Sequence, residues 1–395
     1  MQNTPRANRV HIGIFGPANS GKSSLINAIT GQDVSIVSDI AGTTTDPVNK
    51  SMEVHGIGPV TFIDTAGFDD TGRLGAERVA QTVRAADRTD VALVLCEEGD
   101  LGEESRWIEM FRSKRVPVIA VINKSDLRAD VAGFAARIEK KTGLRPAIVS
   151  AVTGEGIPAL VKAIAEVAQA GDPESIVGNL ASGGDVVMLV MPQDAQAPRG
   201  RLILPQVQTI RDLLDKECIV VACTTDKIEA TLKSLTASPK LIITDSQVFG
   251  TVSRLAPAES LLTSFSVLFA RYKGDMEEFV RGASAIDRLT ENSKVLIAEA
   301  CTHAPLEEDI GREKIPRMLR AKVGQGLKVD VVGGADFPQD LTPYDLIIHC
   351  GACMFNRRHV LSRVGRASGQ NVPITNYGIA IAYLTSILDK VVWPD

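Results

Sequence analysis

The sequence lacks an uninterrupted apolar run of the roughly 18 residues that a membrane-spanning helix requires. Residues 1–6 show no signal-peptide pattern either. Cysteine is scarce, with six in 395 residues, and the cysteines stand singly in apolar runs or in ligand-like pairs rather than as a disulfide framework. These absences predict a cytoplasmic protein in a reducing compartment, with no membrane association.

An excess of positive charge is also missing, because the formal net charge is -5 at pH 7. This balance argues against a large surface for nucleic acid or for anionic membranes. Apolar residues, by contrast, make up 44% of the chain. A chain of this length and composition can bury several cores, and the length predicts roughly two to three domains.

The first motif is a glycine-rich loop, GPANSGKS at residues 16–23, between an apolar segment and a helical pattern. This is the context of a phosphate-binding loop, whose backbone N–H groups cradle phosphates at the positive end of a helix; taken alone, a chance glycine-rich turn is the alternative. Lys22 is expected to reach the terminal phosphates and the Ser23 hydroxyl to bind Mg²⁺. The predicted nucleotide-binding residues of this loop are Gly16, Asn19, Ser20, Gly21, Lys22, Ser23 and Ser24.

Two later motifs are expected to recognise the base. Residues 123–126 read NKSD after an apolar strand, which is the guanine-reading motif of GTPases. Asp126 is expected to accept hydrogen bonds from guanine while Lys124 lies along the base, with Asn123 completing the motif. Ser150 and Ala151 close a further strand at the position where such proteins contact guanine O6. The phosphate-binding loop, a DTAG motif at residues 64–67 and these two motifs follow one another in the order typical of GTPases. This order predicts binding of GTP and GDP.

Residues 64–67 read DTAG after an apolar strand. Asp64 is expected to hold Mg²⁺, usually through water, and the Gly67 N–H to meet the γ-phosphate. Residues 42–46, GTTTD, resemble the switch I of tRNA-modification and ribosome-assembly GTPases, in which one threonine completes the Mg²⁺ shell. That role is assigned to Thr44.

The catalytic glutamine that usually follows the DTAG motif is absent, because Phe68 occupies its position and cannot orient a water molecule. Slow, Mg²⁺-dependent GTP hydrolysis is therefore expected. Asn19, together with this type of switch I, resembles GTPases that place K⁺ where others use an arginine finger, so stimulation by K⁺ is also expected. Asp70 is a candidate to orient water, and an exposed switch carboxylate without that role is the alternative.

The order of expected elements predicts an α/β protein of three domains. Residues 1–171 predict a P-loop GTPase domain of the Ras-like, Era/TrmE type, with a mostly parallel sheet covered on both faces. Residues 172–261, after a Gly-, Ser- and Pro-rich linker, predict a small α/β unit that would gain stability by dimerisation. Residues 262–395 predict a third α/β domain, whose first strand is expected at residues 265–270.

Two short clusters of cysteine and histidine lie in this third region. Cys301 and His303 form the first cluster, and His349, Cys350 and Cys353 form the second. Cysteine and histidine side chains are ligands that soft metals prefer, so this set suits zinc or an iron–sulfur cluster. Both clusters follow predicted strands, at the edge where open α/β sheets form their sites. Cys353 is expected in the first turn of a helix through residues 355–363, whose positive end would favour the thiolate.

These motifs together resemble HydF, the family of GTPases that takes part in maturation of iron-only (FeFe) hydrogenase. The resemblance covers the whole chain and implies a homodimer formed through the middle domain. It also implies a 4Fe-4S cluster on Cys301, Cys350 and Cys353. The family's role is that of a scaffold, in which a transient di-iron precursor assembled with radical-SAM maturases is carried to apo FeFe-hydrogenase. The radical-SAM pattern Cys-x-x-x-Cys-x-x-Cys is absent here, which fits a carrier rather than a radical enzyme.

The fourth cluster ligand is left open by the residues. In an extended segment Cys301 and His303 project to one face, whereas the adjacent His349 and Cys350 diverge, which slightly favours His303. The preferred interpretation is nevertheless three fixed thiolates with an exchangeable fourth position, because a scaffold must accept and release an iron unit. Both histidines would then lie near the precursor or bind weakly.

The main alternative is an RNA- or ribosome-associated GTPase whose C-terminal cysteines bind a structural zinc. Its switch sequences would fit equally well. Against it stand the acidic charge balance and the lack of a recognisable RNA module, so no nucleic-acid partner is expected.

Overall fold

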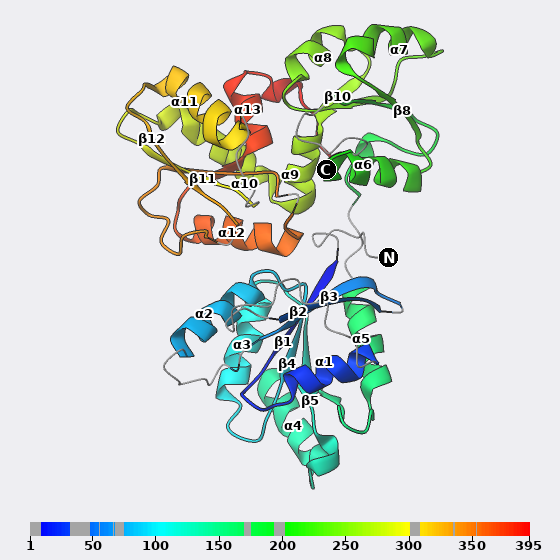
Figure 1. Cartoon of the computed structure of the whole chain (residues 1–395), viewed down its shortest axis with the longest axis vertical. Helices are drawn as coiled ribbons and strands as arrows, with labels where there is room; N and C mark the ends of the chain where they lie inside the picture. Colours follow the sequence, from blue (N-terminus) through cyan, green and yellow to red (C-terminus); the bar gives the residue numbers. More distant parts are fainter. Residues whose placement is uncertain are drawn as a thin grey trace. The chain divides into compact units, whose positions relative to one another are not determined.

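The computed structural model describes the chain except for residues 1–8, 32–47, 55, 66, 68–74, 170–174, 193–201, 301–308, 335 and 353. The chain divides into two compact units, Met1–Pro173 and Glu174–Asp395 (Figure 1). Helices and parallel strands alternate in both units, which confirms the predicted α/β fold class. No helix within the described ranges combines the length and the apolar character needed to cross a bilayer.

The first unit is built on one six-stranded sheet in the order β2-β3-β1-β4-β5-β6. Neighbouring strands are parallel except for β2 and β3, so the predicted mostly parallel sheet is confirmed. The strands are β1 (Val10–Phe15), β2 (Val48–Val54), β3 (Gly58–Asp64), β4 (Val91–Leu95), β5 (Val118–Ile122) and β6 (Ala147–Ile148). The helices are α1 (Lys22–Thr30), α2 (Gly75–Ala86), α3 (Gly102–Ser113), α4 (Val131–Thr142) and α5 (Ile157–Gln169), with a 3-10 turn at Ser125–Leu127.

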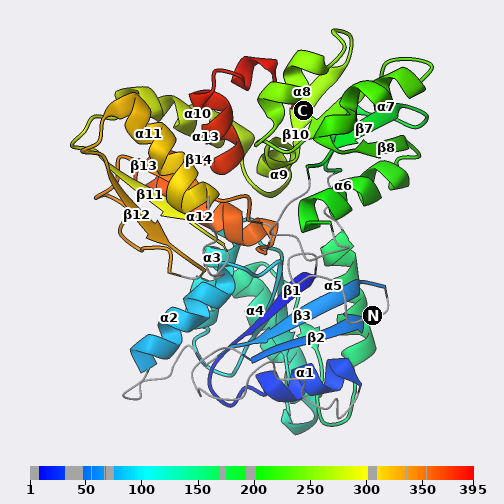
Figure 2. The same cartoon turned by 45° about the horizontal axis from the view of Figure 1, so that its top comes forward.

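Helices cover both faces of this sheet because its central strands are apolar on both sides (Figures 1 and 2). Strand β4 is buried along its whole length. Its residues Val91, Leu93 and Leu95 pack with α1 and α5, while Ala92 and Val94 pack with α3 on the other face. Loops at the carboxyl ends of the strands are therefore the part of this unit that is left for binding.

The second unit contains two four-stranded parallel sheets, of which the first has the order β10-β9-β7-β8. Its strands are β7 (Val186–Val190), β8 (Ile219–Cys223), β9 (Leu241–Thr244) and β10 (Leu261–Ser264). Its helices are α6 (Leu204–Asp215), α7 (Ile228–Ser234), α8 (Phe249–Leu255) and α9 (Phe265–Lys273), with 3-10 turns at Gly178–Leu180 and Thr225–Lys227. Val187 and Leu189 of β7 face α6 and α9, whereas Met188 and Val190 face α7 and α8.

Residues 265–270 form the start of helix α9, so the prediction of a strand there is wrong. The run FSVLFA is almost wholly apolar, and such a run suits a buried strand and a buried helix equally well. Ser264 decides between them, because its side chain accepts the Val267 N–H at 3.3 Å and caps the helix. Strand β10 lies immediately before the helix, with no residue between the two, and pairs with β9 across the boundary predicted between residues 261 and 262. The domain boundaries themselves stay a prediction.

The last sheet has the order β12-β11-β13-β14, again wholly parallel. Its strands are β11 (Lys294–Ala298), β12 (Lys328–Val332), β13 (Leu346–His349) and β14 (Ile374–Asn376). Its helices are α10 (Met276–Ala283), α11 (Ile315–Val323), α12 (Arg357–Gly369) and α13 (Tyr377–Leu384), with a π-helical turn at Ile310–Lys314 and 3-10 turns at Ser284–Arg288 and Leu388–Lys390. Val295 and Ile297 of β11 pack with α11 and α13, while Leu296 and Ala298 pack with α10 and α12.

Strand β14 also passes into its helix without a loop, since Asn376 ends the strand and its side chain caps α13. Helices α9 and α13 lie very close at Gly378, where a Cβ atom would come within 2.5 Å of the Ser266 Cβ. The two sheets of this unit are thus connected through tightly packed helices.

Candidate functional site

The phosphate-binding loop joins β1 to α1, as the sequence predicts. Gly21 is the N-cap of α1 and has a φ of 86°, in the left-handed region that favours glycine. A Cβ atom at Gly21 would lie 2.4 Å from the Asn123 Nδ2, so the neighbouring motif also requires glycine here. The positive end of α1 therefore lies at the loop, where it suits an anion.

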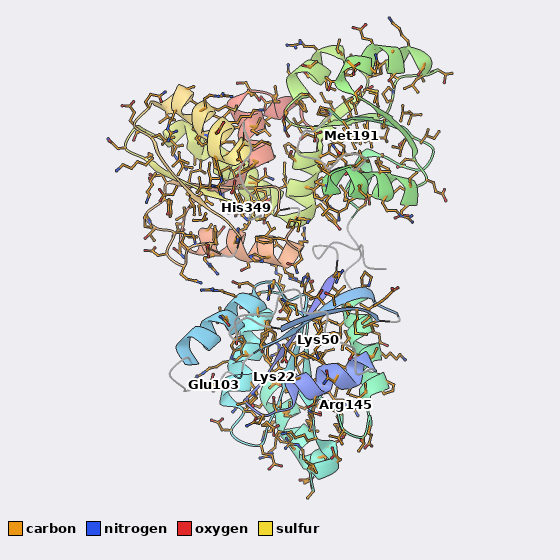
Figure 3. The ribbon with its side chains drawn as sticks, in the orientation of Figure 1. Lys22, Lys50, Glu103, Arg145, Met191 and His349 are labelled. Atoms are coloured by element: carbon orange, nitrogen blue, oxygen red, sulfur yellow. The ribbon has the colours of Figure 1, made fainter. Side chains whose placement is uncertain are left out.

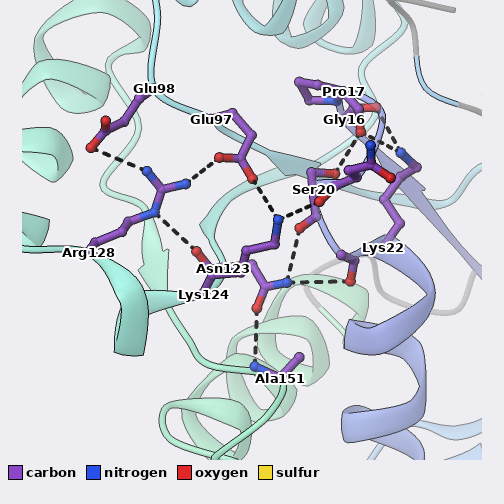
Figure 4. A network of polar contacts seen from close by, with 12 residues as sticks. Gly16, Pro17, Ser20, Lys22, Glu97, Glu98, Asn123, Lys124, Arg128 and Ala151 are labelled. Atoms are coloured by element: carbon purple, nitrogen blue, oxygen red, sulfur yellow. Dashed lines mark hydrogen bonds and ion pairs between the residues drawn. The ribbon is translucent and has the colours of Figure 1, made fainter.

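Lys22 is buried, and its ammonium group lies at the loop. It donates to the carbonyl oxygens of Gly16 at 3.0 Å and of Pro17 at 2.7 Å (Figure 4). Ser20 is also buried and donates from its hydroxyl to the Pro17 carbonyl. Ser24 is exposed in the first turn of α1. Lys22, the first residue of helix α1, is labelled in Figure 3. The Lys22 ammonium group thus lies at the loop, and its contact with the terminal phosphates stays a prediction.

The two predicted Mg²⁺ ligands of the described chain come together. Ser23, in the first turn of α1, donates its hydroxyl proton to Asp64 Oδ2 at 2.5 Å, and Asp64 is the last residue of β3. Gly67 is buried just beyond that strand. Thr44 and Asp70 lie outside the described residues, so their predicted roles stay predictions.

The guanine-reading motif is bonded directly to the phosphate-binding loop. Asn123 donates from Nδ2 to the Ser20 carbonyl at 3.1 Å, and its Oδ1 accepts the Ala151 N–H at 3.1 Å (Figure 4). Lys124 donates to the Asn19 carbonyl at 2.5 Å. Segments far apart in the sequence therefore form one continuous binding edge.

Asp126 is exposed on the 3-10 turn beside this edge, where its carboxylate is accessible. Ser150 is fully buried, and its hydroxyl oxygen accepts the Thr153 N–H at 3.1 Å. This bond shapes the turn that presents Ala151. Direct guanine contacts of these residues stay predictions.

Arg128 is a residue of this edge that the motifs did not reveal. Its guanidinium group donates to the Asn123 carbonyl at 3.3 Å, pairs with Glu97 at 2.5 Å and lies 5.0 Å from the centre of the Phe134 ring. Glu97 also lies 3.9 Å from the Lys124 ammonium group. The sequence offers little that could have indicated this role of Arg128. Two glutamates, Glu97 and Glu98, follow strand β4, and Arg128 lies two positions after Asp126.

In the second unit, Cys350 follows the carboxyl end of β13. Its sulfur accepts the Ala300 N–H at 2.9 Å and the Ala352 N–H at 3.4 Å. Cys301 comes directly after Ala300 in the sequence, but Cys301, His303 and Cys353 lie outside the described residues. Among the residues that the structure describes, no group of three His, Cys, Asp or Glu side chains could hold a metal ion.

The surroundings of Cys350 fit an anionic sulfur ligand, because two N–H donors point at one sulfur atom. Tyr377, at the start of α13, adds to this setting. Its hydroxyl is buried without a hydrogen-bond partner in the described part of the chain. Burial, and after it the charge of Cys350, raise the pKa of Tyr377 well above its usual range.

His349 is buried, and both of its ring nitrogens have protein partners. Nδ1 lies 2.7 Å from the Cys350 carbonyl oxygen, and Nε2 lies 3.0 Å from a guanidinium nitrogen of Arg363 (His349 is labelled in Figure 3). Burial, together with the positive charge of Arg363, lowers the pKa of His349 to about 3, so the ring is neutral. Nδ1 therefore donates to the carbonyl and Nε2 accepts from Arg363. A ligand role for His349 stays a prediction, and it would require one of these bonds to open.

The helix after the cysteines begins later than the sequence predicts. Helix α12 starts at Arg357, and Asn356 caps it by accepting the His359 N–H. The prediction that the first turn contains Cys353 is therefore wrong. Ala352, one of the two residues between Cys350 and Cys353, has a left-handed φ of 50°, which costs a non-glycine residue roughly 1–2 kcal/mol.

Three parts of the chain match known protein families. Residues 11–124 match the family described as 50S ribosome-binding GTPase. Residues 176–274 match the hydrogen maturase F (HydF) dimerization domain, and residues 277–394 match the HydF tetramerization domain. The chain belongs to the HydF family. Its order is thus a P-loop GTPase domain followed by the HydF dimerization and tetramerization domains, the last of which contains the Cys350 site. The names of these HydF domains support an oligomer.

Curated relatives that are GTPases match part of this HydF chain. The tRNA modification GTPase MnmE of Nitrosomonas europaea is 37% identical over 161 residues, which make up 40% of this chain and 35% of that protein. GTPase Der of Wolinella succinogenes is 41% identical over 128 residues, or 30% of this chain and 26% of that protein. The chain therefore spans about a third or less of the length of the curated relatives it matches.

Solved structures resemble the chain more distantly. Aquifex aeolicus Era is 22% identical with a TM-score of 0.35, covering 56% of this chain and 97% of its own. The cytosolic domain of T. maritima FeoB in its GMPPNP form is 21% identical with a TM-score of 0.31, covering 41% of this chain and 65% of its own. TM-scores this low carry no argument about function.

Proposed function

We propose that this chain is a GTP-hydrolysing scaffold for maturation of FeFe-hydrogenase. In this proposal it binds a 4Fe-4S cluster, receives a transient di-iron precursor assembled with radical-SAM maturases, and delivers it to apo FeFe-hydrogenase. The observation that supports the proposal most is the Cys350 sulfur, which accepts two backbone N–H groups at the carboxyl edge of a sheet within a HydF domain. Hydrogen bonds to sulfur are among the features by which proteins stabilise and tune such clusters.

The cluster would be held by the thiolates of Cys301, Cys350 and Cys353. The bond from the Ala300 N–H to the Cys350 sulfur supports this set, because Cys301 is the next residue of the same backbone. His303 stays the favoured protein candidate for the fourth position. When bound, the cluster would supply iron sites, one of them exchangeable, and the di-iron precursor would be cargo rather than a resident group.

The nucleotide chemistry would be carried by the first unit. Lys22 would neutralise the terminal phosphates, and Asp126 would read the base. The contact of 2.5 Å between the Ser23 hydroxyl and Asp64 supports a shared Mg²⁺ position, which Thr44 would complete in the triphosphate state. These roles would orient GTP in one direction, with its phosphates at the start of α1 and its guanine base at the NKSD motif.

Hydrolysis would be slow, because Phe68 stands where a water-orienting glutamine is usual. Asn19 would favour K⁺ at the phosphates, and Asp70 stays a candidate to orient the attacking water. A slow reaction suits a timer for partner exchange better than a motor.

An RNA- or ribosome-associated GTPase with a structural zinc site is the alternative, and its support is the match of residues 11–124 to a family described as ribosome-binding. The two HydF matches cover most of the remaining chain and favour the maturation scaffold. The homodimer is proposed to form through the HydF dimerization domain, and the HydF tetramerization domain would allow further assembly.

Metal analysis of anaerobically purified protein tests the proposal. Iron and acid-labile sulfide should be present in the wild-type chain and nearly absent after Cys350→Ala. The matched control is Cys223→Ala, which removes a half-buried cysteine of β8 far from the Cys350 site in sequence and should keep full iron content. Stoichiometric zinc without sulfide in the wild-type protein would refute the scaffold and support the alternative.

A further inference from the structure

Lys273, the last residue of helix α9, is only 3% exposed. Its ammonium group donates to the carbonyl oxygens of Ala352 at 3.1 Å and Phe355 at 2.8 Å. It also lies 5.9 Å from the centre of the Phe269 ring. Burying an ammonium group is costly unless its protons are bonded and its charge is balanced nearby. Both of these carbonyl oxygens belong to residues 350–356, which we call the cysteine loop.

The cysteine loop contains a conformation that needs support. Ala352 has a left-handed φ and, unlike asparagine or aspartate, no polar side chain that could compensate by a local hydrogen bond. Its N–H is directed to the Cys350 sulfur at 3.4 Å, and its carbonyl oxygen accepts from Lys273. The strained residue that aims an N–H at the sulfur is thus held in place by the buried ammonium group.

A second contact fixes the same end of α9 to the far side of the loop. Arg357, the first residue of α12, donates to the Tyr272 carbonyl at 2.8 Å and to the Arg271 carbonyl at 3.3 Å. Helix α9 itself is anchored in the core of the first sheet of this unit through Phe265, Leu268 and Phe269. The cysteine loop is therefore supported by a helix that belongs to the neighbouring sheet.

The charge of Lys273 matters as well as its hydrogen bonds. A cluster bound by thiolates is an anion, and reduction adds a further negative charge. In a buried setting a nearby positive charge stabilises the more negative state, because the interaction is weakly screened. A buried ammonium group at this loop should therefore favour the reduced cluster.

We propose that Lys273 is a positioning residue of the cluster site, whose buried ammonium group holds the cysteine loop in its metal-binding shape and raises the reduction potential of the bound cluster. The effect on the reduction potential rests on the proposed function, because it requires a bound cluster. The positioning of the cysteine loop concerns the protein without metal.

The test uses the full-length chain and three replacements. Lys273→Met removes the charge and the donors and keeps an apolar side chain, and Lys273→Arg keeps both charge and donors. Lys273→Gln keeps a neutral donor and serves if the methionine variant fails to fold. The matched control is Lys390→Met, because Lys390 is an exposed lysine of the same unit.

The first measurement is amide hydrogen exchange of residues 350–356 in metal-free protein. Losing charge-assisted hydrogen bonds should make this segment exchange at least about tenfold faster in Lys273→Met. The segment should be unchanged in Lys390→Met, close to wild type in Lys273→Arg and intermediate in Lys273→Gln. Unchanged exchange in both neutral variants would overturn the positioning role.

The second measurement is the midpoint potential after anaerobic reconstitution with iron and sulfide, followed by electron paramagnetic resonance. Lys273→Met and Lys273→Gln should give a lower potential than wild type, and Lys273→Arg should restore it. A wild-type potential in both neutral variants would overturn the electrostatic role. If the wild-type protein takes up no cluster, the proposed function fails, and hydrogen exchange still decides whether Lys273 holds the loop.

Discussion

Replacing Arg128 with glutamine would show how strongly nucleotide binding depends on a side chain that lies outside the NKSD motif and contacts it. The Arg128 guanidinium group donates to the Asn123 carbonyl at 3.3 Å and pairs with Glu97 at 2.5 Å and Glu98 at 3.5 Å. Glutamine is too short and uncharged to keep all of these contacts. The Asn123 backbone would therefore lose one of its contacts, while the side-chain bonds of Asn123 to the phosphate-binding loop remain.

The expected magnitude follows from the exposure of each partner. The side chain of Arg128 is 9% exposed, whereas those of Glu97 and Glu98 are 29% and 65% exposed. The Glu98 pair, which is the most exposed, should contribute little, in the range of about 0–1 kcal/mol for surface pairs. The charge-assisted bond to Asn123 contributes roughly 1.5 kcal/mol and is the part that acts on the base-reading motif. Loss of this bond predicts roughly a tenfold higher Kd for GDP.

The assay is titration of a fluorescent GDP analogue in the presence of Mg²⁺. Arg137→Gln is a matched control, because Arg137 lies 5.1 Å from the same Phe134 ring that Arg128 covers at 5.0 Å. The control should leave the Kd unchanged. Arg128→Gln protein that binds GDP as tightly as wild type would refute the reasoning.

Four other outcomes are expected. Asp126→Asn should shift preference from guanine toward xanthine nucleotides, because it replaces the acceptor that is predicted to read guanine; unchanged selectivity in competition assays would argue against this role. GTP hydrolysis should be faster in K⁺ than in Na⁺, and equal phosphate release in the two salts would remove the role given to Asn19. Replacing Cys350 with alanine should abolish iron–sulfur binding while GTP hydrolysis stays nearly intact, and loss of both activities would contradict separate sites. Glu104→Gln should stabilise the first unit at neutral pH, because burial raises the pKa of Glu104 in the folded state. The stability that Glu104 contributes is present below the ordinary carboxyl pKa and is lost as pH rises through the raised one. Thermal unfolding at pH 4 and pH 7 should therefore show a larger increase in the melting temperature of Glu104→Gln over wild type at pH 7.

The fold class and the nucleotide-binding edge could be predicted from the sequence because both depend on local order. Apolar strands followed by glycine- and charge-bearing loops predict a parallel sheet with its loops at one edge, and the structure bonds Asn123 to Ser20 there. Arg128 could not be found in this way. Its importance comes from Glu97, which is 31 positions away and reaches it only through the packing of β4 beside β5.

The second unit shows where a linear pattern is insufficient. The run at residues 265–270 has no polar face, so strand and helix could be separated only by the cap at Ser264. The start of α12 depends on Asn356 as its cap rather than on the cysteines. For His349, its bonds to Arg363 and to the Cys350 carbonyl result from tertiary packing. A Cys-His pattern predicts metal-binding chemistry but does not reveal which nitrogen atoms the protein itself has already used.

The direct passage of β10 into α9 limits how this chain can change length. An α-helix turns about 100° per residue, so one residue inserted between Ser264 and Phe265 would rotate every later side chain of α9 by that angle. Lys273 would then point away from the Ala352 and Phe355 carbonyls that it now contacts. The same holds for β14 and α13, where Gly378 leaves no room against Ser266. Insertions and deletions should therefore be excluded at these two junctions, where the number of residues sets the direction in which each helix presents its side chains.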